Sequence, residues 1–306
     1  MFTTASRPVA RLSALAATLA TLAATPALAQ EVTFDTAAGP MTLDAKPETI
    51  ITLDLPAVDT LTALGVTLAG VPTPLYVDYL SDIEAPAAGT LFEPNYELIA
   101  ATQPDLIIAG GRSQAQVEPL SQIAPTADMT LGFDAVADGR ARLATYGKLT
   151  GTEAKAAELD AALEAKLEKA RALVADHGNA LILMTNGPKL SVYGKDSRFG
   201  WIHSELGWPQ AVEDIDGSSH GEAVSFEYLA KANPDTLIVV DRAQAIGADD
   251  ANARTTLDNE LVHGTKAWQS GRVIFLPAAD SYIAGGGIQS LNRTLDVLIG
   301  ALETAS

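Results

Sequence analysis

The 306-residue sequence contains no cysteine. Disulfide bonds, thiolate metal sites and cysteine nucleophiles are therefore excluded, and so is a signal peptide whose cysteine would carry a lipid anchor. The sequence also lacks a Walker loop, an HExxH zinc motif and a dinucleotide-binding fingerprint. These absences argue against thiol-dependent, zinc-dependent and nucleotide-dependent enzymes.

Positive charge is scarce as well. Twenty Lys and Arg residues stand against 38 Asp and Glu residues, which gives a formal net charge of -18. A chain with this balance repels nucleic acid and anionic lipid, so neither is expected as a partner. Any anionic ligand must be bound by a local cluster of cations, against the overall field of the protein.

The N-terminus has the pattern of a secretory signal peptide. Arg7 and Arg11 precede an apolar run over 12–24, and the segment ends in the small residues of "ALAQ". The run is shorter than the roughly 20 strongly apolar residues that span a bilayer. We therefore expect residues 1–29 to be removed, with export to the periplasm and no membrane anchor. Two arginines and no acid are lost with the segment, so the formal net charge becomes -20.

A repeat organises the rest of the chain. "NYELIAATQPDLIIAGGR" begins at residue 95 and "SFEYLAKANPDTLIVVDR" begins 130 residues later. Both stretches spell a helix N-cap, a short helix, a Pro-Asp turn, a buried strand and a final arginine, Arg112 or Arg242. The repeat predicts two related β/α lobes.

The predicted fold class is α/β, with two Rossmann-like β/α lobes joined by a rigid long helix. The segment 134–178 is dense in Ala, Leu, Glu and Lys and predicts two consecutive helices without a flexible linker. We expect a strand over 67–72, a helix over 198–207 and a loop around 279–287. The predicted organisation is a signal peptide at 1–29, an N-terminal lobe at 30–133, a connecting backbone helix at 134–150 and a C-terminal lobe at 151–306.

Three arginines stand at strand or loop ends: Arg112 in "GGRSQ", Arg198 in "KDSRFG" and Arg242 in "VVDR". In open α/β sheets, ligands bind in the crevice outside the carboxyl ends of the strands. Three converging guanidinium groups could hold a trianion there, because each presents several donors and a permanent charge. The alternative for each arginine is a surface salt bridge.

Two loop residues suggest a metal. His220 lies in "DGSSHGE" and Tyr282 in "ADSYIAGGG", and imidazole and phenolate are both good ligands for ferric iron. The alternative for each is a solvated or hydrogen-bonded side chain. His177, His203 and His263 lie in helical or charged contexts and are interpreted as structural.

Together these segments resemble the periplasmic substrate-binding proteins of ABC importers for ferric siderophores, of the catecholate type that binds enterobactin or petrobactin. The resemblance covers nearly the whole mature chain, from "KPETIITLDLPAVDTLTALG" to "SYIAGGGIQSL". It implies a class III, or cluster A, binding protein with a helical backbone and small lobe closure. It also implies a monomer without enzymatic activity and without an intrinsic cofactor, whose ligand is an Fe(III)-siderophore complex.

The resemblance further implies roles for individual residues. The arginines at 112, 198 and 242 would surround a trianionic ferric catecholate, and His220 and Tyr282 would complete the coordination of iron when the siderophore supplies only four donors. Glu97 and Glu227 would dock onto the inner-membrane permease. These glutamates also have a purely structural interpretation, since each follows a helix N-cap, where a carboxylate stabilises the helix dipole.

Two other functions remain as alternatives. One is a haem- or corrinoid-binding protein of the same fold. The other is a secreted serine hydrolase, because "GSSHG" fits the G-x-S-x-G elbow with Ser219 as nucleophile and His263 as base. That elbow needs a strand directly before it, and the preceding "VEDID" is too acidic to predict one.

Overall fold

The structure is a computed structural model, and it describes residues 1–4, 31–215, 217–218, 220–250 and 252–304. Most of the predicted signal peptide and the candidate nucleophile Ser219 lie outside these ranges. Within them, no helix combines the length and the apolar character that crossing a membrane requires.

The N-terminal lobe is built on a three-stranded parallel sheet in the order β3–β4–β5. Its strands are buried along their whole length, as expected when helices cover both faces of a parallel sheet. A β1–β2 hairpin precedes them. The elements are β1 (Val32–Thr36), β2 (Gly39–Leu43), β3 (Ile50–Thr52), α1 (Leu55–Ala63), the 3-10 helix η1 (Asp78–Leu80), α2 (Tyr96–Thr102), β4 (Leu106–Ala109), the 3-10 helix η2 (Gln114–Gln116), α3 (Val117–Leu120) and β5 (Thr126–Asp128).

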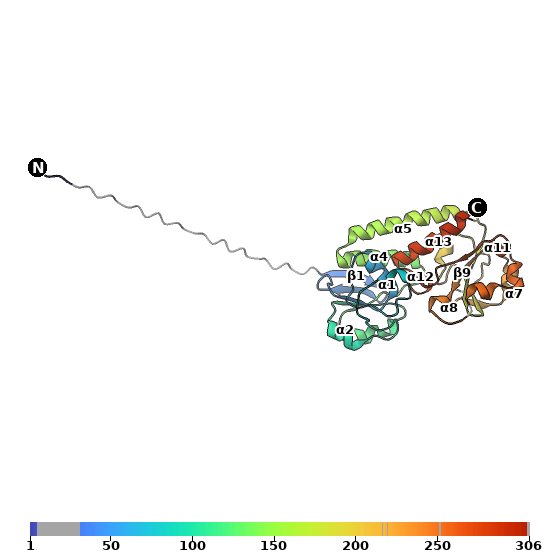
Figure 1. Ribbon diagram of the computed structural model, residues 1–306, viewed down its shortest axis with the longest axis horizontal. Helices are drawn as coiled ribbons and strands as arrows, with labels where there is room; N and C mark the ends of the chain where they lie inside the picture. The colour runs from blue at the N-terminus through green and yellow to red at the C-terminus, as the bar shows by residue number, and fades with distance from the viewer. Residues whose placement is uncertain (5–30, 216, 219, 251, 305–306) are drawn as a thin grey trace.

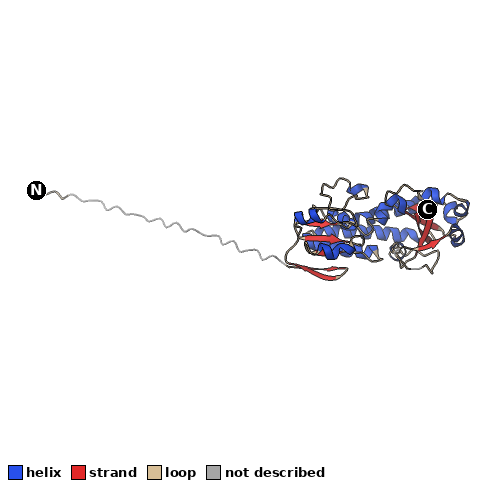
Figure 2. Cartoon of the chain, turned by 90° about the horizontal axis from the view of Figure 1, so that it is seen from below, coloured by secondary structure: helices blue, strands red, loops and turns tan. Residues whose placement is uncertain are grey.

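The C-terminal lobe contains a five-stranded mixed sheet in the order β10–β9–β6–β7–β8. Strands β10, β9 and β6 run parallel, whereas β7 and β8 are antiparallel to their neighbours. Figure 2 shows the strands in two separate groups, one in each lobe. The elements are β6 (Ala180–Asn186), β7 (Lys189–Tyr193), α6 (Trp201–Ser204), β8 (Glu222–Val224), α7 (Phe226–Ala232), β9 (Thr236–Asp241), α8 (Arg242–Ala245), α9 (Ala253–Leu257), α10 (Glu260–His263), α11 (Lys266–Gln269), β10 (Val273–Phe275) and α12 (Ala278–Tyr282).

Three long helices pack against one another: α4 (Ala135–Thr150), α5 (Glu153–Val174) and α13 (Ile288–Thr304). Helix α5 packs against both α4 and α13, and α13 also packs against α1 of the N-terminal lobe. Figure 1 shows α5 and α13 side by side along one edge of the molecule. The two consecutive helices predicted from the sequence are confirmed, and the connection between the lobes is helical.

The repeat corresponds to one supersecondary unit in each lobe. Asn95 caps α2 and Ser225 caps α7, and each of these seven-residue helices ends at a left-handed residue. The following aspartates bind backbone N–H groups of the neighbouring segment: Asp105 accepts from Glu48 and Thr49, and Asp235 accepts from Asn179. These bonds tie the start of each strand to the start of its partner strand. The repeated residues therefore fix the register that places Arg112 and Arg242.

Two predicted elements differ from the structure. Residues 67–72 form only isolated bridges, from Gly70 to Ile51 and from Val71 to Ala87. The helix expected over 198–207 is limited to α6, since a tight turn at Gly200 precedes it and Gly207 adopts φ 64°. The β1–β2 hairpin and strand β8 were not predicted.

Candidate functional site

The three predicted arginines converge on one residue, Tyr282, at the end of α12. Arg112 Nη2 and Arg198 Nη2 donate to the Tyr282 carbonyl at 2.8 and 2.5 Å, and Arg242 Nε donates to the Tyr282 hydroxyl at 3.0 Å. Their guanidinium carbons lie 5.5, 4.3 and 5.7 Å from the centre of the Tyr282 ring. The three arginines that the sequence singled out therefore lie together around Tyr282.

Arg112 reaches the cluster from the N-terminal lobe. It follows the carboxyl end of β4, after a turn in which Gly110 is required: a Cβ there would lie 1.9 Å from a carboxylate oxygen of Asp54. Its guanidinium then crosses to the C-terminal lobe, where it also donates to the Ile283 carbonyl at 3.3 Å. Arg112 therefore links the two lobes directly.

Arg198 and Arg242 come from the C-terminal lobe. The loop of Arg198 is a tight turn, in which a Cβ at Gly200 would lie only 2.0 Å from the Lys195 carbonyl oxygen. Arg242 opens α8 directly after β9, and its Nη1 donates to Asn186 Oδ1 at 3.0 Å. Asn186 at the end of β6 is a site residue that the sequence reasoning missed.

The positive charge of the cluster is not neutralised by ion pairs. Among the described residues, no carboxylate lies within ion-pairing distance of Arg112, Arg198 or Arg242. The surface salt bridges considered as an alternative are therefore not what these side chains form. Burial and the nearby charge of Arg198 lower the pKa of Arg112. Burial and like-charge repulsion make the charged form of Arg112 less stable than that of an exposed arginine. An anion that binds in the cluster would stabilise the charged form again.

The pKa of Tyr282 shifts in the opposite direction to the pKa of an ordinary buried tyrosine. Burial is the largest influence and raises its pKa, but the hydrogen bond from Arg242 and the charges of all three arginines lower it, and the net shift is downward. The cluster therefore favours the phenolate, which is the form that binds a hard metal ion.

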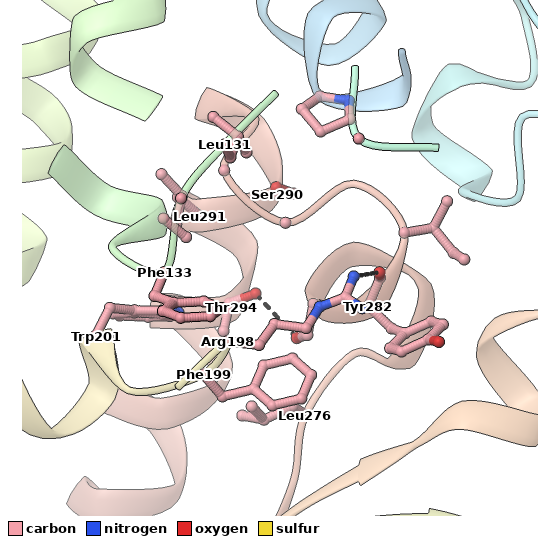
Figure 3. Close-up of a pocket in the computed structure, with 18 of the residues that line it drawn as sticks. Leu131, Phe133, Arg198, Phe199, Trp201, Leu276, Tyr282, Ser290, Leu291 and Thr294 are labelled. Atoms are coloured by element: carbon pink, nitrogen blue, oxygen red, sulfur yellow. Dashed lines mark hydrogen bonds between the residues drawn. The ribbon is translucent and has the colours of Figure 1, made fainter. Parts of the chain in front are cut away.

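A cavity of about 410 Å³ opens beside the cluster, between the lobes and α13. Arg112, Arg198 and Tyr282 line it, as do residues of α6 and α13. In Figure 3, Arg198 lies at the centre of the view, and the Tyr282 hydroxyl points to the side opposite Trp201 and Phe133. A volume of this size is in the range of small-molecule sites.

Asp54 also lines the cavity and was not predicted. It caps α1 by accepting a hydrogen bond from the Ala57 N–H at 3.2 Å. Burial raises its pKa to about 6, although that hydrogen bond and the charge of Arg112 oppose the shift. The residue follows the carboxyl end of β3, so the strand-end rule that pointed to Arg112 also applied to it.

His220 lies on an exposed loop before β8, and it does not line the cavity. Its carbonyl accepts a hydrogen bond of 2.9 Å from Tyr193, which holds the backbone of the loop. Tyr282, which we expected in a loop, ends α12 instead. Within the described ranges, no three His, Asp or Glu side chains gather as a metal site of their own.

Glu97 and Glu227 occupy equivalent exposed positions, in the first turns of α2 and α7. A hydrogen bond with Ser225 is the main cause that lowers the pKa of Glu227. The helix-stabilising position that the sequence predicts for both is therefore observed, and both carboxylates face solvent.

This architecture, two β/α lobes on a helical backbone with a charged cleft between them, defines a solute-binding protein. The family model described as periplasmic binding protein matches residues 50–279, and the chain belongs to this family. The petrobactin-binding protein YclQ of Bacillus subtilis is 34% identical over 84% of this chain and 83% of its own length. Its crystal structure superposes with a TM-score of 0.83, covering 90% of this chain and 99% of YclQ.

Two further relatives have names that refer to iron carriers. The ferric-anguibactin-binding protein FatB of Vibrio anguillarum is 31% identical over 87% of this chain and 86% of its own length. The periplasmic catecholate-siderophore-binding protein VctP of Vibrio cholerae has a TM-score of 0.81 and 29% identity, over 88% of this chain and 99% of VctP.

Proposed function

We propose that this protein captures an Fe(III)-catecholate siderophore in the periplasm and delivers it to an ABC permease for iron uptake. The observation that carries the proposal is the convergence of three arginines on Tyr282 beside a cavity that Arg112, Arg198 and Tyr282 line, with no ion pair to any of the three among the described residues. A ferric tris-catecholate carries three negative charges, so it complements the cluster in charge. The similarity to YclQ, FatB and VctP supports the same class of ligand.

Tyr282 and His220 are proposed to complete the coordination of iron when the siderophore supplies four donors. The lowered pKa of Tyr282 supports its part, because the phenolate is the ligating form. His220 would reach the iron from an exposed loop, and the Tyr193 hydroxyl donates a hydrogen bond to the backbone carbonyl of His220 in that loop. The chelator supplies the remaining donors, so the metal arrives and leaves as cargo. The protein needs no intrinsic cofactor and performs no chemical turnover in this role.

Glu97 and Glu227 are proposed to dock onto the permease, one from each lobe. Their exposure and their equivalent positions in the repeat support a contact with two related surfaces of one partner. Import of ferric catecholate by cells carrying Glu97→Arg and Glu227→Arg measures this role. Loss of import with unchanged binding by the purified protein is expected, and normal import would refute it.

Selectivity for charge tests the proposed function. Purified protein, titrated while its tryptophan fluorescence is followed, should bind a trianionic Fe(III) tris-catecholate far more tightly than a neutral ferric trihydroxamate. Trp201 lines the cavity and provides the signal. Tighter binding of haem or a corrinoid than of any ferric catecholate would assign the protein to a different ligand class.

A further inference from the structure

The cavity has charged lining residues on one side and apolar lining residues on the other. An iron chelate accounts for the charged residues only. On the side of the arginine cluster, the cavity is lined by Arg112, Arg198 and Tyr282. The other side, toward α6 and the start of α4, is lined by the apolar side chains of Leu131, Phe133, Phe199, Trp201, Leu276 and Leu291. Figure 3 shows Phe133, Trp201 and Leu291 on the side of Arg198 away from the Tyr282 hydroxyl. We name these six residues the aromatic chamber.

The polar groups of α13 beside the chamber are already paired. The Ser290 hydroxyl donates to the carbonyls of Ala284 at 2.6 Å and Gly287 at 2.9 Å. The Thr294 hydroxyl lies 3.4 Å from that of Ser281. The wall that α13 contributes is therefore suited to hydrocarbon rather than to a ligand that needs new hydrogen bonds.

Two phenylalanines at this cavity are exposed, although most large apolar side chains of the described chain are buried. Phe133 is 48% exposed and Phe92 is 56% exposed, and both line the cavity. By contrast, Trp201 is only 5% exposed. The aromatic chamber therefore combines a buried side chain, Trp201, with an exposed one, Phe133. Aromatic side chains left open at the mouth of a cleft gain favourable free energy when a ligand covers them.

Arg198 joins the two parts. Its guanidinium carbon lies 4.3 Å from the Tyr282 ring centre and 5.7 Å from that of Phe199, which belongs to the chamber. It donates only one of its five N–H groups to Tyr282 in the described structure. A chelate bound to this guanidinium therefore carries any substituent on its linker directly to the chamber.

We propose that the aromatic chamber is a specificity subsite for an apolar, ring-sized part of the siderophore outside its iron-binding groups. This inference rests on the proposed function and adds the class of chelator: a catecholate carrying an aryl or branched alkyl substituent, rather than a bare polar catecholate. Continuity with the arginine cluster is the reason that the occupant is part of the chelate and not a separate molecule.

The test uses two Fe(III) complexes of equal charge. Both chelators are bis(2,3-dihydroxybenzamides) on the same short diamine linker, and one linker carries a benzyl group. The wild-type protein should bind the benzyl complex about tenfold more tightly, as expected for burial of one aromatic ring. Phe133→Ala should remove this preference by weakening the binding of the benzyl complex about tenfold more than the binding of the unsubstituted complex.

Val297→Ala is the matched control, because Val297 is another exposed apolar residue, 37% exposed, and does not line the cavity. It should keep the preference for the benzyl complex. Equal binding of both complexes by the wild type, or an equal loss of both in Phe133→Ala, would overturn the subsite while leaving the proposed function in place. Failure of both complexes to bind the wild type would overturn the proposed function, and the subsite with it.

Discussion

Arg198→Ala is expected to weaken the binding of a trianionic Fe(III) tris-catecholate by about 30- to 1,000-fold. Truncating one partner of a desolvated, hydrogen-bonded charge pair costs about 2–4 kcal/mol, which corresponds to this loss in Kd. Arg198 has the shortest distance of the three arginines to the Tyr282 ring and borders both parts of the cavity. Arg198→Lys should lose less, because it keeps the charge but not the planar fork of donors.

Arg254→Ala is the matched control for this experiment. Arg254 is an exposed arginine of the same lobe, with its guanidinium carbon 4.0 Å from the centre of the Phe275 ring, and its replacement changes the net charge equally. Isothermal titration of the three variants and the wild type distinguishes the effect of the local cluster on affinity from the effect of the overall charge. An Arg198→Ala affinity within about twofold of the wild type, or an equal loss in Arg254→Ala, would contradict the role of the cluster.

Asp59→Ala is expected to have the largest effect on stability, a loss of about 3–5 kcal/mol in the free energy of unfolding. The fully buried carboxylate of Asp59 in α1 accepts hydrogen bonds from Tyr79 Oη at 2.5 Å and from the N–H groups of Gln289 and Ser290 at 2.8 and 2.9 Å. Its loss leaves three donors unpaired where the N-terminal lobe meets α13. Chemical denaturation measures the change.

A surface cap provides the comparison for Asp59. Asp134 accepts hydrogen bonds from the first turn of α4 at a less buried position, so Asp134→Ala should cost only about 1 kcal/mol. If Asp59→Ala cost no more than Asp134→Ala, the hydrogen bonds of Asp59 would not be a main contribution to the contact between α1 and α13.

The Asp59 carboxyl also gives the stability a defined pH dependence. Burial raises its pKa from 3.8 to about 7 in the folded protein, so the folded state binds this proton more tightly than the unfolded state. The group therefore adds stability as the pH falls from about 7 toward 4, and this contribution is absent above pH 7. Because Asp59→Asn does not titrate, the wild type should gain stability relative to this variant between pH 8 and pH 5. A constant difference would contradict the assignment.

The parts of the site that follow from local rules were predictable from the sequence. Arg112 and Arg242 stand at strand ends fixed by a repeated cap, turn and aspartate, and the same rule would have identified Asp54. Asp59 could not be found in this way, because its role depends on hydrogen bonds to Gln289 and Ser290 of α13, which lie more than 200 residues further along the chain. Phe133 could not be found either, because it lines a cavity whose walls come from distant parts of the chain. The segment at 67–72 shows the converse, because its apolar residues predicted a strand and the structure has only isolated bridges there.

His220 illustrates a limit of a different kind. Sequence context suggested a ligand because the loop is polar and rich in glycine, whereas the structure shows an exposed side chain that does not line the cavity. The arginine cluster, by contrast, is held by hydrogen bonds to Tyr282 and Asn186.

The position of iron in crystals grown with an Fe(III) bis-catecholate shows whether the arginine cluster holds the chelate. Anomalous scattering at the iron absorption edge should give one peak in contact with the Tyr282 hydroxyl oxygen, surrounded by the guanidinium groups of Arg112, Arg198 and Arg242. An iron peak on an outer surface of either lobe, or inside the aromatic chamber away from Tyr282, would contradict the account.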